Sequence, residues 1–273
     1  MRPFLFTIGA MKVPSFFFFI MVAVLATTFY CYWVGVRRGL KPDAILDMGI
    51  IGMLAGVLGA RIFHILVEYP SYYWAKPVRV FEFWRGGFVS WGGFISVVVA
   101  LLVYFRIRKL PVLIYFDLLA VAAPVVKFFV RLACLLTGCC YGKPTHVPWA
   151  ITFTNPASTA YYYYPNTPLH PTQIYSMIHA VLLFIFINWF YRRKNRYDGQ
   201  TTCVLAMGWT LPRMFIELFR GDVDRGVYFH GLLSTGQITG AVVFVTALLL
   251  FYGPHLWFFL LFSSQIIFIK KYF

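Results

Sequence analysis

The sequence predicts an all-α membrane protein with about seven transmembrane helices. Of its 273 residues, 60% are hydrophobic and only 12% are charged, whereas about a quarter of the residues in a soluble domain carry a charge. The aromatic share of 21% suits lipid-facing surfaces and the aromatic belts at membrane interfaces. Apolar stretches of about 20 residues, the length of a helix that crosses a bilayer, recur along the chain. These observations exclude a soluble globular domain.

Seven apolar stretches are the candidate transmembrane helices. They cover about residues 14–36, 44–67, 87–105, 112–136, 173–191, 200–219 and 237–260. The first is longer than the apolar part of a signal peptide and its basic residues follow it, so we expect an uncleaved span. The chain has no linker or low-complexity tract, which predicts one polytopic domain over residues 1–273. Beyond Pro254 the chain either extends the last helix past a kink or lies along the interface.

The distribution of Lys and Arg predicts how the chain is oriented. Three short loops and the C-terminal tail carry twelve of them, namely Arg37, Arg38, Lys41, Arg106, Arg108, Lys109, Arg192, Arg193, Lys194, Arg196, Lys270 and Lys271. The opposite side carries eight over much longer loops, namely Arg2, Lys12, Lys76, Arg79, Arg85, Lys143, Arg220 and Arg225. Because the dense side is the cytoplasmic one, we expect the N-terminus outside and the C-terminus in the cytoplasm. The two long loops, 68–86 and 137–172, then face the outer leaflet.

The formal net charge of +15 does not by itself indicate a nucleic-acid partner. The basic residues fall mostly in short clusters at the ends of apolar segments, where they face anionic lipid head groups. Membrane topology therefore explains the charge, and we expect no nucleic-acid binding.

Four basic residues inside the predicted spans, joined by the acid Glu217, indicate a polar site within the bundle. They are Arg61, Lys127, Arg131, Arg213 and Glu217. Placing such a charge in hydrocarbon costs at least about 2.5–3.5 kcal/mol, so each should face the bundle interior and have a partner. Lys127, Arg131 and Cys134 follow the spacing i, i+4, i+7, which puts them on one face of a helix.

A second charged stripe, Arg213, Glu217 and Arg220, lies on one face of the sixth span. Together the two stripes predict a cationic pocket, for which a phosphodiester is the economical ligand because guanidinium groups bind phosphate oxygens in bidentate fashion. Glu217 would orient an arginine or act as a base. The alternative is that this stripe is only an ion-pair network within one helix.

Paired glycines mark the start of the third span. Gly86-Gly87 and Gly92-Gly93 frame residues 88–91. Glycine allows backbone with positive φ and a close approach of a ligand, and such backbone is tolerated at membrane depth where it lines a cavity. Close packing between helices is the alternative explanation.

The five cysteines do not form a disulfide framework, because their number is odd and they are scattered through apolar segments. The adjacent pair Cys139-Cys140 follows the fourth span. These thiols would act as a nucleophile, form a strained vicinal disulfide or fill space as inert groups. No C-x-x-C or histidine spacing is present, so we expect no metal site.

His170 opens the fifth span and is a candidate general base for a reaction at the outer leaflet. Pro171 suits the first turn of a helix, and Thr172 or His170 would cap that helix. A capping role for His170 is therefore the alternative.

A series of motifs follows in a recognisable order. It comprises Gly59-Ala-Arg61, Gly86-Gly87 with Gly92-Gly93, Arg131 with Gly138, Gly142-Lys-Pro-Thr145, Pro148-Trp-Ala150, His170-Pro-Thr-Gln173-Ile-Tyr175, Asp198-Gly199-Gln200, Arg213-x-x-x-Glu217-x-x-Arg220 and Leu233-Ser-x-Gly-Gln237. With seven spans in this order, the chain resembles the bacterial prolipoprotein diacylglyceryl transferase family over about residues 14–260.

The resemblance implies transfer of a diacylglyceryl group from phosphatidylglycerol to the lipobox cysteine thiol of a prolipoprotein, with release of glycerol phosphate. Sulfur is alkylated at a glycerol carbon, so no acyl carbonyl is attacked and no cofactor is expected. The implied partners are phosphatidylglycerol, prolipoproteins and membrane lipids. The implied location is the bacterial plasma (inner) membrane, with the active site open toward the outer leaflet.

The resemblance also implies roles for individual residues. Arg131 matches the arginine that holds the phosphatidylglycerol phosphate. We expect phospholipid binding by Arg131, Arg61, Gly92, Gly93 and Gly142. We expect catalytic roles for Arg213, Glu217, Arg220 and His170. The candidates for a thiol role are Cys134, Cys139 and Cys140.

This chain departs from the family pattern at five positions. The residues found here in place of His, Asn, Glu, Tyr and Glu are Trp91, Cys134, Cys139, Trp209 and Ser176. Without the usual histidine, the base would be Glu217, His170 or His64. One alternative function is a paralogue that uses the same donor with another acceptor, through a covalent intermediate on one of the three thiols. The other is a lipid-binding, transport or thiol redox protein without enzymatic activity.

Overall fold

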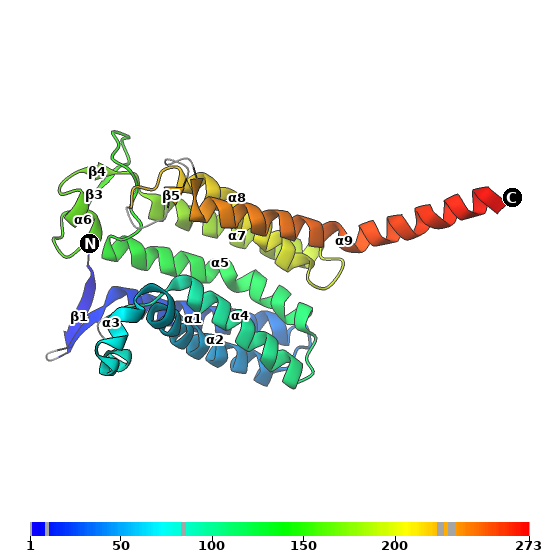
Figure 1. The fold of residues 1–273 in the computed structure, drawn as a ribbon, viewed down its shortest axis with the longest axis horizontal. Coiled ribbons are helices and arrows are strands. Elements are labelled where there is room, and N and C mark those ends of the chain that lie inside the picture. The colour runs from blue at the N-terminus through cyan, green and yellow to red at the C-terminus, as the bar shows by residue number, and fades with distance from the viewer. Residues whose placement is uncertain (1, 9–10, 83–85, 223–226, 229–232, 273) are drawn as a thin grey trace. The chain divides into compact units, whose positions relative to one another are not determined.

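The described residues form long helices with three small two-stranded sheets, one before the first helix and two in the loops (Figure 1). The structure, a computed structural model, describes residues 2–8, 11–82, 86–222, 227–228 and 233–272. It divides into two compact units, which we describe separately. Unit 2 is residues 24–118, and unit 1 combines residues 1–23 with residues 119–273. The prediction of a single domain stays a prediction.

The long helices occupy the predicted spans to within a few residues. They are α1 (Ser15–Val36), α2 (Pro42–Phe63), α4 (Ser90–Ile107), α5 (Val112–Thr137), α7 (Thr172–Arg193), α8 (Gln200–Glu217) and α9 (Thr235–Tyr272). Within the described part of the chain, six helices are long and apolar enough to cross a membrane. The six exclude α8, whose sequence carries several polar residues besides Arg213 and Glu217. The predicted all-α membrane class is confirmed, with six to seven spans.

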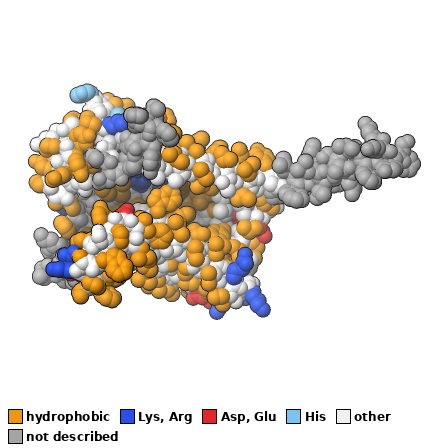
Figure 2. All heavy atoms as spheres, in the orientation of Figure 1, with side chains coloured by type: hydrophobic (Ala, Val, Ile, Leu, Met, Phe, Trp, Pro, Cys, Tyr) orange, Lys and Arg blue, Asp and Glu red, His pale blue; other side chains and the backbone are white. Residues whose placement is uncertain are grey.

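The outward faces of the helices are apolar. Leu25 and Phe29 on α1 and Leu182 on α7 are among many large hydrophobic side chains that are exposed. Figure 2 shows hydrophobic side chains over most of the helical surface, with Lys and Arg mainly toward the helix ends. A surface of this kind is stable against lipid tails and not against water.

Unit 2 is built on the close contact between α2 and α4. A Cβ atom added to Gly92 would lie 2.3 Å from Cβ of Phe63, and one added to Gly93 would lie 2.9 Å from the carbonyl oxygen of Gly56. Both glycines are therefore needed to let the two helices touch. Close packing explains this pair, so their assignment to phospholipid binding stays a prediction.

Short irregular elements connect α2 to α4. They are the π-helix η1 (His64–Glu68), α3 (Pro70–Trp74) and the 3-10 helix η2 (Pro77–Phe81). Gly86 and Gly87 both have positive φ, of 80° and 81°, so the predicted use of glycine for left-handed backbone holds here. The sequence did not indicate the helical content of this connection.

In unit 1, α7 and α9 both pack against α8. Its long loop, residues 138–171, contains α6 (Thr159–Tyr163) and the paired strands β3 (Ile151–Thr152) and β4 (Pro168–Leu169). A small core stabilises the loop, formed by Tyr141, Phe153, Ala160 and Leu169. The loop is therefore a packed substructure.

The remaining strands were not predicted. They are the antiparallel pairs β1 (Phe4–Ile8) with β2 (Met11–Pro14) and β5 (Val227–Tyr228) with β6 (Leu233–Ser234). Beyond Pro254, α9 continues as a helix to Tyr272, as expected if this segment extends the last predicted span.

Candidate functional site

Gly142 lies where three backbone segments of unit 1 meet. Its N–H donates to the carbonyl of His170 over 3.1 Å, and it forms a β-bridge with Arg220. The next residue, Lys143, donates its N–H to the carbonyl of Phe219 over 2.8 Å. A Cβ atom on Gly142 would lie 2.4 Å from the His170 oxygen, so a glycine is required. This contact joins the ends of α5 and α8 to the start of α7.

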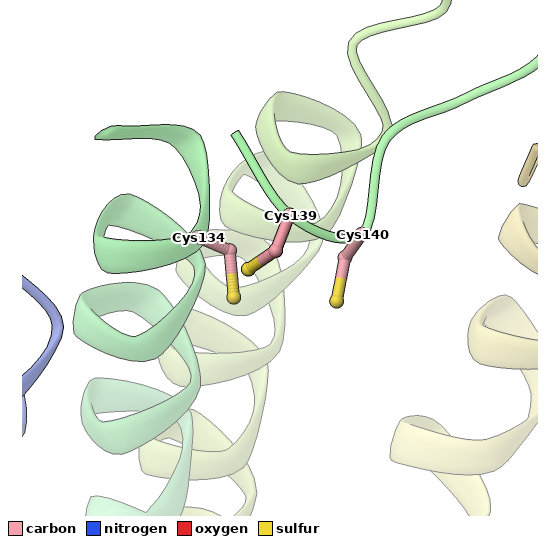
Figure 3. Close-up of side chains that lie close together, drawn as sticks. All are labelled: Cys134, Cys139 and Cys140. Atoms are coloured by element: carbon pink, nitrogen blue, oxygen red, sulfur yellow. The ribbon is translucent and has the colours of Figure 1, made fainter. Parts of the chain in front are cut away.

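Three cysteine thiols converge at the end of α5. The sulfur atoms of Cys134, Cys139 and Cys140 all lie within 4.8 Å of one another. Figure 3 shows the side chains of Cys134 and Cys139 directed toward one another, with Cys140 on the same side of the loop. The chain reverses because Gly138 adopts φ of +72° after the last helical turn and Cys140 adopts +55°. Sequence spacing did not indicate this cluster, since two of the thiols lie beyond the helix.

The start of α7 holds the two cysteines of the loop. The hydroxyl of Thr172 donates to the carbonyl of Cys140 over 2.8 Å, and Nε2 of Gln173 donates to the carbonyl of Cys139 over 2.8 Å. The N-cap position of the helix is occupied by Pro171, and no side chain makes a capping hydrogen bond there. The prediction that His170 or Thr172 caps α7 is therefore wrong, because the Thr172 hydroxyl is used on the cysteine loop.

The charged stripe on α8 forms a chain of ion pairs. Glu217 is buried and lies 3.3 Å from Nη2 of Arg213 and 3.4 Å from Nη1 of Arg220. Arg220 also binds Asp222 in bidentate fashion, with 2.8 Å from Nε to Oδ1. Sequence analysis anticipated the pairs within the helix but missed Asp222, which lies two residues beyond Arg220.

Arg131, which is partly buried, differs from the buried cations Lys127 and Arg220. It forms no hydrogen bond or ion pair with any residue that the structure describes, although its charge acts on Lys127, Arg213 and Cys140. Unit 1 therefore holds an arginine that lacks a carboxylate, close to other cations. A positive charge close to other cations is stabilised when an anion binds.

Lys127 has a partner that sequence analysis missed. Its Nζ lies 2.7 Å from Nδ1 of His179 on α7, and Nε2 of His179 lies 3.0 Å from the carbonyl of Gly208. Because a carbonyl only accepts, Nε2 carries the proton and Nδ1 accepts from Lys127. Lys127 also lies 4.3 Å from the centre of the Trp209 ring. The signal for this contact in the sequence was His179, a single histidine within an apolar span.

The neighbouring charges affect the groups at the end of the helices. Hydrogen bonds from the two neighbouring thiols, and then the charges of Arg131 and Arg220, hold the pKa of Cys140 well below its usual value, against the opposing effect of burial. Burial would lower the pKa of Arg220, but the hydrogen bond to Asp222 and nearby negative charges raise it overall. Of the three thiols, Cys140 is thus the one that ionises first.

His170 lies beside this region. Its Nδ1 is 3.2 Å from the hydroxyl of Tyr175, which accepts a 2.7 Å hydrogen bond from Nε1 of Trp149. The imidazole also packs edge-on against Phe219, with 5.1 Å between ring centres. This places His170 next to the segment that carries Arg220.

Arg61 belongs to unit 2, where it holds the loop that precedes α4. Its guanidinium donates to the backbone carbonyls of Arg79, Val80, Glu82, Gly86 and Gly87. Beside it, Nδ1 of His64 lies 2.9 Å from the Tyr73 hydroxyl, and both basic residues line a cavity of about 270 Å³. Because the loop uses the donors of Arg61, its role in phosphate binding stays a prediction. Trp91, at the start of α4, is 52% exposed.

Replacing Arg61 with methionine is expected to open this loop. Each carbonyl left without a donor costs about 1–3 kcal/mol, so trypsin should cleave after Arg79 at least about ten-fold faster. Timed digestion with mass spectrometry measures the rate. Arg108→Met, which removes an exposed ion pair with Asp43, is the matched control, and equal rates in the two variants would contradict this role.

The fold and the site define a class of protein: a polytopic membrane protein with paired guanidinium and carboxylate groups near one end of α8. The family model for prolipoprotein diacylglyceryl transferase matches residues 3–253, and the chain belongs to this family.

Relatives support this assignment along most of the chain. The phosphatidylglycerol–prolipoprotein diacylglyceryl transferase of Clostridium tetani is 30% identical over 92% of this chain and 97% of its own length. The second such enzyme of Clostridium perfringens is 31% identical over 92% of this chain and 94% of its own length. That of Corynebacterium glutamicum is 30% identical over 79% of this chain and 71% of its own length. The predicted family, enzyme class and multi-pass membrane location are confirmed.

Proposed function

We propose that this chain moves the diacylglyceryl group of phosphatidylglycerol onto the lipobox cysteine of a prolipoprotein, and that unit 1 binds the donor phosphate. The observation that carries the site assignment is Arg131, a cation inside a predicted span without a carboxylate partner among the described residues. Arg213 is 25% exposed and shares Glu217 with Arg220, so it too has donors available. Two guanidinium groups then face one phosphodiester.

The reaction forms one bond and breaks one bond. The acceptor sulfur attacks the glycerol carbon that carries the phosphate, the C–O bond breaks, and glycerol phosphate leaves with the electron pair. Negative charge grows on the leaving oxygen in the transition state. Preorganised donors such as Arg131 and Arg213 stabilise that charge more than they stabilise the bound lipid, which is what accelerates the reaction.

Among the predicted bases, the geometry favours His170 over Glu217. Glu217 lies between two guanidinium groups and contacts both, which makes it a counter-ion that orients them. The Tyr175 oxygen can accept from both Trp149 and Nδ1 of His170, which leaves Nε2 of His170 as a proton acceptor.

A covalent intermediate on an enzyme cysteine is disfavoured by the chemistry. Alkylation of a protein thiol forms a thioether, and a thioether sulfur is a poor leaving group at neutral pH. The acceptor thiol therefore attacks the lipid directly.

We place the site at the outer leaflet. The end of α5, the start of α7 and the end of α8 meet at Gly142, and all three lie on the side with fewer Lys and Arg residues. By the positive-inside rule this side faces away from the cytoplasm of the bacterium.

Reconstitution tests the proposal. In vesicles that contain phosphatidylglycerol, a lipobox peptide should gain the mass of one diacylglyceryl group. Neither a peptide with serine in place of the lipobox cysteine nor vesicles of phosphatidylethanolamine alone should give product. An unmodified cysteine peptide would refute the proposed acceptor, and an adduct that stays on the protein would point to the covalent route.

A further inference from the structure

The three-thiol cluster of Cys134, Cys139 and Cys140 has the geometry of a ligand set. All three sulfur atoms lie within 4.8 Å of one another. Tetrahedral Zn²⁺ with bonds of about 2.3 Å separates its thiolates by about 3.8 Å. The thiols therefore need to close by only about 1 Å around such an ion, which a side-chain rotation provides.

The surrounding structure holds this geometry in place. The two loop carbonyls are fixed by Thr172 and Gln173 over 2.8 Å each, and Cys140 keeps a left-handed backbone with φ of +55° that a non-glycine residue rarely adopts. Oε1 of Gln173 is buried without a hydrogen-bond partner among the described residues. An unsatisfied acceptor beside the loop indicates that a donor, such as a ligand water, belongs there.

Charge also suits a metal at this position. Three thiolates with a divalent ion carry a net charge of −1. The charges of Arg131 and Arg220 act on Cys140, and Arg131 has no ion pair among the described residues. A complex with negative charge is therefore stabilised beside these guanidinium groups.

We propose that these cysteines bind one thiophilic divalent cation such as Zn²⁺, and that its open fourth position takes the acceptor thiol. Three protein ligands with one open position are the arrangement of catalytic zinc sites, and coordination deprotonates a thiol. The second half of this proposal rests on the proposed function. The acceptor thiol would release its proton to water or His170 on binding, and its sulfur would then form the bond to the glycerol carbon as the phosphate leaves.

Cd²⁺ titration of the full-length protein tests the site without reference to activity. Reduced protein in detergent, stripped with a chelator, should bind one equivalent of Cd²⁺ and develop thiolate-to-metal charge-transfer absorption. Cys134→Ser and Cys139→Ser should each weaken binding at least about ten-fold, whereas Cys203→Ser, a thiol near the other end of α8, should bind as the wild type does. Thermal melting confirms that each variant is folded. Absence of the absorption in the wild type, or equal binding by all variants, would overturn the site.

The transfer assay tests the role of the open position. Chelation should lower the rate at least about ten-fold, and added Zn²⁺ should restore it in the wild type and in Cys203→Ser. Full transfer by the metal-free protein would overturn the role of the metal while leaving the proposed function intact. Cd²⁺ binding without any transfer to the lipobox peptide would instead count against the proposed function and uphold the site.

Discussion

Arg131→Ala is expected to lower the rate of diacylglyceryl transfer by about 100- to 1,000-fold, the loss found when one preorganised donor to a developing negative charge is removed. Arg131 has no carboxylate partner among the described residues, so its removal leaves no buried acid unpaired. The protein should therefore remain folded while the chemistry fails. Initial rates with a lipobox peptide in phosphatidylglycerol vesicles measure the effect.

Two further variants show whether the loss reflects phosphate binding. Arg131→Lys keeps the charge but not the planar fork, so it should recover only part of the rate. Arg193→Ala removes an exposed arginine at the end of α7 and should change little. If Arg131→Ala transferred lipid at the wild-type rate, the site assignment would have to be abandoned.

Glu217→Ala is expected to have the largest effect on stability. It leaves Arg213 and Arg220 without their shared buried carboxylate, and breaking a buried pair by removing one partner costs about 3–5 kcal/mol. Asp222 still neutralises part of Arg220, which places the result toward the lower end. The midpoint of unfolding in detergent under denaturant measures it, with Glu68→Gln, a half-exposed carboxylate, as the control.

Variants of Glu217 also show whether this residue acts as a counter-ion or as a base. If Glu217 orients the arginines, Glu217→Ala with Arg213→Met should regain part of the lost stability, because one unpaired charge is gone. If Glu217 were instead the base, Glu217→Gln would fail to transfer lipid even under conditions in which the variant is fully folded. That result would reassign the role we give to His170.

The positions of the long helices could be predicted from local pattern alone. A run of about 20 apolar residues is stable across a bilayer only as a helix, because its backbone groups must satisfy one another. Accordingly α1 and α5 begin and end within a residue of the predicted bounds. The ion pair of Arg213 with Glu217 was also predictable, since it joins residues four apart on one helix, whereas Arg220 lies beyond the end of α8.

Contacts between distant segments could not be predicted in this way. Arg61 serves five loop carbonyls some 18 to 26 residues away, and His179 meets Lys127 from another helix 52 residues on. The periodic spacing of residues along the sequence does not indicate such pairs. The three thiols were candidates in the sequence, but their convergence was not predicted, because it depends on left-handed backbone at Gly138 and Cys140 that brings two of them back toward Cys134.

The sequence by itself determined the membrane class, the bounds of the spans and the family, because each depends on composition, on apolar runs or on motifs in order. The tertiary structure decided which partners the cations have among the described residues. Pairing depends on where side chains from different helices end in space. In a low-dielectric interior, that placement determines whether a charge is satisfied within the protein or by the molecule that binds to it.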